Sequence, residues 1–230
     1  MYDNINEREA TPQNDQAMLE RCMFLGRRLR LTFGISLSML IMSTLFQGGG
    51  WLSSGRVIFA SRHTSFLVFL FDGVSIVLAI AYCAILISMG DHCKAFTISG
   101  ILMIVSTFLS VCKEFDERMW LVLLITVAAF VAEILQMKYF VDGCEGSLFG
   151  VDGGLATNWN TLWEVYLTIL GATFASMVCY FIPGIRVFAE FIAFSLMIAD
   201  IGVSIVMLIL IRQSSDALIR YAFLHEHKSV

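Results

Sequence analysis

The chain has 230 residues, of which 58% are hydrophobic and 15% charged, and its formal net charge is -4. Soluble domains are about half apolar and about a quarter charged, so this composition, with a mean hydropathy of +0.79, excludes an ordinary soluble fold. We expect an all-α integral membrane protein whose main partner is the lipid bilayer. No run of basic residues interleaved with aromatics occurs in the sequence, so we expect no nucleic acid partner.

The first 27 residues form a polar segment that we place in the cytosol. Its five acidic residues are untypical of a cleavable signal peptide, so we expect the first span to be retained. Helical spacing of apolar side chains predicts a short juxtamembrane helix over 17–28. The first span then covers 29–46, and three consecutive glycines at 48–50 are expected to end it.

Five further apolar runs follow, and each is long enough for a transmembrane helix. They cover 64–89, 95–112, 119–140, 161–182 and 187–211. The six runs have 18 to 26 residues, close to the roughly 20 that cross a hydrocarbon core about 30 Å thick. A glycine-rich loop of 20 residues is expected over 141–160. The predicted organisation is a cytosolic segment 1–27, a six-span domain 28–212 and a cytosolic tail 213–230.

Basic residues determine the expected orientation. With the N-terminus in the cytosol, ten Lys and Arg residues lie on the cytosolic side and five on the opposite side. The positive-inside rule then places both termini in the cytosol. The four tryptophans lie at predicted span ends, where indole rings anchor at the headgroup boundary; they are Trp51, Trp120, Trp159 and Trp163.

Three acidic residues within the apolar runs are the candidate functional residues: Asp72, Glu133 and Asp200. A charge at mid-bilayer costs roughly 3 kcal/mol, so such residues normally face a bundle interior and pair with a partner. No Lys, Arg or His lies deep in any predicted span. Three alternatives remain for these carboxyl groups. They are protonated and neutral, they accept hydrogen bonds from hydroxyl groups, or they line a wet path for a cation or proton. The candidate hydroxyl donors are Ser75, Ser99, Ser106, Thr107, Thr126, Ser195 and Ser204.

These acids support two functions. The leading hypothesis is a channel or transporter for a proton, a cation or a small solute, in which the three acids form a polar pathway. The alternative is a structural scaffold or an accessory subunit of a membrane complex, in which neutral acids join helices through hydrogen bonds. Sequence motifs of nucleophilic, metal-dependent and phosphate-binding enzymes are absent, so we expect no enzymatic activity and no cofactor.

Cysteines and small residues carry two further hypotheses. Cys22, Cys93 and Cys144 lie near the predicted cytosolic surface and are candidates for lipidation. The spacing of Gly171 and Ala175 permits close contact between helices, which favours a homo-oligomer or a larger membrane complex.

Two patterns are open to more than one interpretation. Asp142, Glu145 and Asp152 offer oxygen ligands for Ca²⁺ in the expected loop, but their spacing differs from that of an EF-hand, and we expect no metal site. Segments 55–77 and 184–206 match at nine of 23 positions. Either an internal duplication or chance similarity between apolar sequences accounts for this match.

Overall fold

The computed structural model describes residues 12–53, 63–114, 119–180, 184 and 186–226. Six α-helices cover most of these residues. Their bounds are α1 Pro12–Ser53, α2 His63–Met89, α3 Lys94–Glu114, α4 Met119–Leu148, α5 Gly153–Tyr180 and α6 Arg186–Glu226. The described part of the chain contains no strand, so the predicted all-α fold is confirmed.

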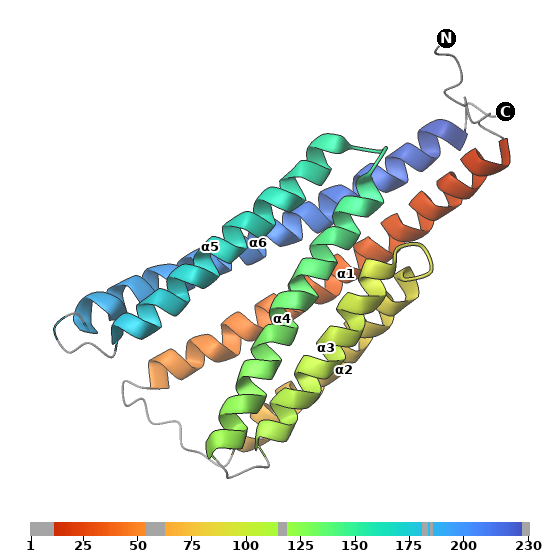
Figure 1. Cartoon of the computed structure of the whole chain (residues 1–230). Coiled ribbons are helices and arrows are strands. Elements are labelled where there is room, and N and C mark those ends of the chain that lie inside the picture. The colour runs from red at the N-terminus through yellow and green to blue at the C-terminus, as the bar shows by residue number, and fades with distance from the viewer. Residues whose placement is uncertain (1–11, 54–62, 115–118, 181–183, 185, 227–230) are drawn as a thin grey trace.

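The helices form a ring in which neighbours in sequence are neighbours in space (Figure 1). Each helix packs against the next one, and α1 packs against α6 to close the ring. Because successive helices alternate in direction, the start of α1 and the end of α6 lie at the same end of the ring. The helical part of the chain therefore begins and ends on one side.

The helices pack closely along one half of their length, at the end of the ring where α1 begins and α6 ends. We call this end the packed half. Phe140 of α4 lies in its core, with its ring edge-to-face on Phe96 of α3 at 6.0 Å and on Trp159 of α5 at 5.8 Å between centroids. All three side chains are fully buried, and buried side chains of α1, α2 and α6 complete the cluster. Such aromatic pairs contribute about 0.5–1.5 kcal/mol beyond their buried area.

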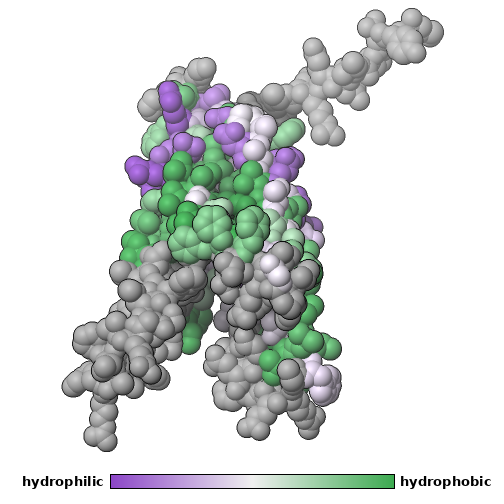
Figure 2. Space-filling model, turned by 90° about the vertical axis from the view of Figure 1, so that its left-hand side faces the viewer, coloured by the Kyte–Doolittle hydropathy of each residue, from purple (hydrophilic) through white to green (hydrophobic). Residues whose placement is uncertain are grey.

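Along the other half of their length the helices are spread apart. There α5 and α6 diverge from α2, α3 and α4 (Figure 1), and large apolar side chains are exposed, such as Phe108 (65%) and Phe174 (66%). Figure 2 shows polar residues gathered at one end of the molecule and apolar residues along its sides. A continuous apolar surface of this kind is typical of contact with a membrane or another protein.

Among the described residues, two helical segments are long and apolar enough to cross a membrane: Trp120–Leu148 of α4 and Phe194–Glu226 of α6. A core helix of a soluble protein meets the same requirement but is mostly buried. Here only 11% and 24% of the two apolar windows are buried within the chain. Membrane association is supported by these two helices, and the other predicted spans stay predictions.

The predicted loop over 141–160 is wrong. α4 continues to Leu148 and α5 begins at Gly153, so most of that segment is helical. The glycines were interpreted as loop residues, but Gly143 is a packing residue. A Cβ at Gly143 would lie 2.8 Å from the ring of Phe96, so only glycine allows α4 to approach α3 this closely.

The connection between α4 and α5 is a tight turn. Gly150 has a φ of 83°, a conformation that glycine adopts without strain. The backbone N–H groups of Val151 and Asp152 donate to Leu148 O. Asp152 Oδ1 in turn accepts a hydrogen bond from Leu155 N at 3.0 Å, which caps the start of α5.

α1 and α6 are longer than predicted. α1 is one helix through the juxtamembrane segment and the first apolar run, and it continues past the glycines at 48–50. α6 extends to Glu226, through most of the predicted tail 213–230. Ser215 and Leu218 of this extension are buried, so packing rather than hydropathy determines where α6 ends.

Glycines mark where helices approach most closely within the chain. A Cβ at Gly26 would lie 2.7 Å from Ile219 Cγ1, at the contact of α1 with α6, and one at Gly100 would meet a side chain of α2 at 3.0 Å. By contrast, nothing lies within 4 Å of a Cβ at Gly171, and Ala175 is exposed. The predicted small-residue pair therefore has no partner helix among the described residues, and its role in an oligomer stays a prediction.

One of the four predicted interface tryptophans lies in the core. Trp159 is fully buried and its Nε1 donates to Ser214 Oγ at 2.9 Å, so its prediction as a headgroup anchor is wrong. Trp120 is 63% exposed at the start of α4, in agreement with its prediction. Trp163 is half-buried, and the side chain of Trp51 lies outside the described residues.

Candidate functional site

Two of the three predicted acids have described side chains. Glu133 lies on α4 and Asp200 on α6, and both are exposed in the single chain. At a rise of 1.5 Å per residue, Glu133 lies about 22 Å from the end of α4 at Leu148. Asp72 belongs to α2, but its side chain lies outside the described residues.

Tyr166 of α5 lies within electrostatic range of both acids. α5 packs against both α4 and α6. The charges of Asp200 and, less strongly, of Glu133 lie close enough to act on the Tyr166 hydroxyl, although no hydrogen bond joins it to either acid among the described residues. We call Glu133, Tyr166 and Asp200 the acid–tyrosine group. The sequence indicated both acids, but it did not indicate the tyrosine, because nothing distinguishes it from other aromatic residues in the apolar runs.

A line of polar and aromatic side chains connects this group to the packed half. The ring of Tyr166 stacks on that of Trp163, with 5.8 Å between centroids. Lys138 Nζ of α4 lies 5.6 Å from the Trp163 ring centroid and 2.6 Å from Asp142 Oδ1. Lys138 is therefore paired with Asp142, and no cationic side chain of the described residues pairs with either acid of the group.

Hydroxyl groups that were predicted to bind the acids donate elsewhere. Five of them donate to backbone carbonyl oxygens: Ser99 to Gln136 O, Ser106 and Thr107 to Met103 O, Thr126 to Val122 O, and Ser195 to Phe191 O. A hydroxyl group has one proton to donate, so these five are not donors to a carboxylate. For them, the predicted hydrogen bonds to the acids are wrong.

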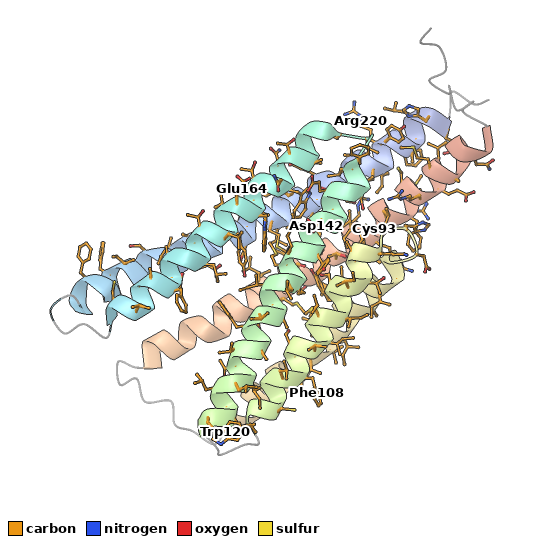
Figure 3. The ribbon with its side chains drawn as sticks, viewed as in Figure 1. Cys93, Phe108, Trp120, Asp142, Glu164 and Arg220 are labelled. Carbon is orange, nitrogen blue, oxygen red and sulfur yellow. The ribbon has the colours of Figure 1, made fainter. Side chains whose placement is uncertain are left out.

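The three candidate lipidation sites differ in exposure. Cys22 and Cys144 are 3% and 0% exposed, whereas Cys93 is partly exposed, with its Sγ 4.0 Å from Gly143 O. Burial raises the pKa of the Cys22 thiol, and the charge of Arg21 offsets part of that effect. Figure 3 shows Cys93 in the packed half. Lipidation stays a prediction, and Cys93 is the most accessible of the three thiols.

Two of the three acids of the predicted loop have structural roles. Asp142 pairs with Lys138, and Asp152 caps α5. Glu145 lies on α4. Over the described residues, no group of three His, Cys, Asp or Glu side chains is arranged to hold a metal ion.

Comparisons with known proteins give no family for this chain. No protein-family model matches it. No curated protein and no solved structure matches it significantly either. The functional argument therefore depends on the acid–tyrosine group and on the residues around it.

Proposed function

We propose that this chain is an integral membrane protein that crosses the bilayer six times, with both termini in the cytosol. Exposed apolar side chains occur on α1, α2, α3 and α5 as well as on the two longest apolar helices, for example Leu31, Ile80 and Ile104. Helices satisfy their backbone hydrogen bonds internally, so a helical ring with an apolar outer surface suits a bilayer.

We further propose that the protein is a channel or transporter for a proton, a cation or a small solute. The observation that supports this function best is that Glu133 and Asp200, on different helices, share the electrostatic environment of Tyr166 without a cationic partner in the described part. Acids in a membrane without a fixed cation favour a mobile cation or a proton as their counter-charge.

The chemistry of the group suits this role. Carboxylate oxygens replace part of the hydration shell of a cation, and a carboxyl group also takes up and releases protons. The hydroxyl of Tyr166 both donates and accepts hydrogen bonds, so it is able to connect the two acids. Asp72 of α2 is proposed as a third residue of the pathway, as the sequence predicts.

Ion and proton flux into proteoliposomes tests this function. We expect wild-type protein to conduct, and Glu133→Gln and Asp200→Asn each to lower the flux by about tenfold or more, a rise of roughly 1.4 kcal/mol in the barrier. Tyr166→Phe keeps the ring and removes the hydroxyl, and we expect an intermediate loss. Asp72→Asn is expected to lower the flux as well.

Glu164→Gln is the matched control. Glu164 is an exposed acid of the same helix as Tyr166, and two residues along a helix point to nearly opposite sides. Figure 3 labels this residue on α5. Its substitution should leave the flux unchanged. Flux that is absent from wild-type protein, or unchanged in every variant, would remove the transport function.

A second candidate function is a scaffold or an accessory subunit of a membrane complex. The observation in its favour is that Glu133 and Asp200 are exposed in the single chain, where a second protein would cover them. This function predicts that Glu133→Gln and Asp200→Asn reduce association with a partner or a second copy, measured by size in mild detergent, while wild-type liposomes show no flux.

A further inference from the structure

An arginine of α1 pairs with an aspartate of α6 along one seam in the packed half. Arg30 of α1 donates from its Nη2 to Asp216 Oδ1 of α6 at 2.7 Å, and both side chains are more than half exposed. Close contacts at Gly26 keep α1 and α6 together at this level, where Ser215 Oγ donates to Gly26 O at 2.7 Å. The seam is therefore a rigid contact with an exposed outer edge.

Helical spacing places further arginines on the same edge. Arg212 and Arg220 lie four residues before and four residues after Asp216, so the three form one stripe along α6. Arg27 lies three residues before Arg30 on α1. All four arginines are exposed, and Figure 3 shows Arg220 toward the end of α6.

The seam carries an excess of positive charge. Asp216 pairs with Arg30, so among the described residues the other three arginines have no acidic partner at the seam. Glu20 of α1 is the next acid on the Arg27 side, two helical turns away. Arg28 is not part of the seam, because its guanidinium lies over the ring of Phe24 at 5.2 Å.

The seam also lies at the boundary of the apolar surface. Leu31, directly after Arg30, is exposed and begins the apolar part of α1, and in the sequence the long apolar run of α6 ends at Ile211, directly before Arg212. Two antiparallel helices thus change from apolar to basic at the same level. In a bilayer this level is that of the lipid headgroups.

We propose that Arg27, Arg30, Arg212 and Arg220 bind the headgroup of an anionic phospholipid in the cytosolic leaflet. Guanidinium groups bind phosphate oxygens through paired hydrogen bonds, and four of them on a rigid seam provide more donors than Asp216 accepts. The site depends on the membrane placement proposed above, but it does not depend on transport.

Binding of short-chain lipids to the detergent-purified full chain tests the site. The probes are dioctanoyl phosphatidylserine, dioctanoyl phosphatidylcholine and inorganic phosphate, and lipid-bound protein is measured by native mass spectrometry. We expect the serine lipid to bind and the other two to bind at least tenfold more weakly. The double variant Arg212→Gln/Arg220→Gln should lose about thirtyfold in affinity, since each basic residue near an anionic surface contributes roughly 1 kcal/mol.

The matched control removes two positive charges elsewhere. Arg28→Gln/Lys94→Gln lowers the net charge by the same amount outside the seam, and we expect its affinity to stay within about twofold of wild type. An equal loss in both double variants, or equal binding of the two lipids, would overturn the proposal. If inorganic phosphate binds as strongly as the serine lipid, the arginines recognise free phosphate and the proposal of a lipid headgroup is wrong. If the α6 variant does not fold, Arg27→Gln on α1 repeats the test with an expected loss of about fivefold.

Discussion

The contact between α1 and α6 provides the most direct test of the fold. A Cβ at Gly26 would lie 2.7 Å from Ile219 Cγ1 and 3.1 Å from the backbone oxygen of Ser215. The side chain of Ile219 is able to rotate, but the backbone of α6 has to move. Gly34 lies eight residues further along α1, and nothing lies within 4 Å of a Cβ there. The two glycines lie on the same helix, Gly26 buried against α6 and Gly34 exposed, and an added methyl group meets a neighbour only at Gly26.

The expected effects of Gly26→Ala and Gly34→Ala have opposite signs. Alanine stabilises a helix by roughly 1 kcal/mol relative to glycine, so Gly34→Ala should raise the free energy of unfolding by about 0.5–1 kcal/mol. At Gly26 the same gain is opposed by overpacking of about 1–3 kcal/mol, which leaves a net loss of roughly 1 kcal/mol. The two variants should differ by about 2 kcal/mol, or about 4–8 °C in melting temperature for a chain of this length.

Thermal unfolding of the purified full chain in detergent measures this difference. Ile219→Ala removes the closest atom, so Gly26→Ala should cost less in an Ile219→Ala background than in wild type, and the double-mutant cycle gives that coupling. A Gly26→Ala protein as stable as Gly34→Ala would refute the reasoning. It would mean that α1 and α6 do not approach each other as closely as the structure describes.

Three further predictions concern single residues. Ser214→Ala leaves the buried indole N–H of Trp159 without an acceptor, so the free energy of unfolding should fall by about 1–3 kcal/mol; an unchanged melting temperature would contradict the hydrogen bond. Asp152→Ala should cost about 1 kcal/mol and increase amide exchange at the start of α5, whereas Asp152→Asn should keep most of the cap; equal effects would exclude capping. The raised pKa of the buried Cys22 thiol leaves less thiolate at pH 8, so maleimide should label Cys93 first and Cys22 only at higher pH or after unfolding; equal rates would show that Cys22 is accessible.

Hydropathy predicted the number and approximate position of the helices because it shows which segments are apolar enough to be removed from water. The break between α2 and α3 lies where the predicted runs 64–89 and 95–112 are separated. Hydropathy did not predict where α6 ends, because its polar extension is stabilised by contacts with the first half of α1. Arg30 and Asp216 are polar residues in sequence, yet they join the two helices.

Glycine was the main source of error in the predicted boundaries. A glycine favours a loop when its conformation is left-handed, as at Gly150, and a helix contact when a neighbour lies close, as at Gly143 and Gly26. The two cases look alike in a single sequence. Only the position of Phe96 distinguishes the helical Gly143 from a loop residue.

The sequence by itself determined that apolar helices dominate this protein and that Glu133 and Asp200 lie within them with no basic residue deep in any predicted span, because composition and spacing are local properties. The tertiary structure decided that Tyr166 lies within electrostatic range of both acids, that Trp159 is a core residue, and that Arg30 of α1 pairs with Asp216 of α6. These facts depend on which faces of separate helices meet. That choice is made by packing between residues distant in the chain, which no local pattern records.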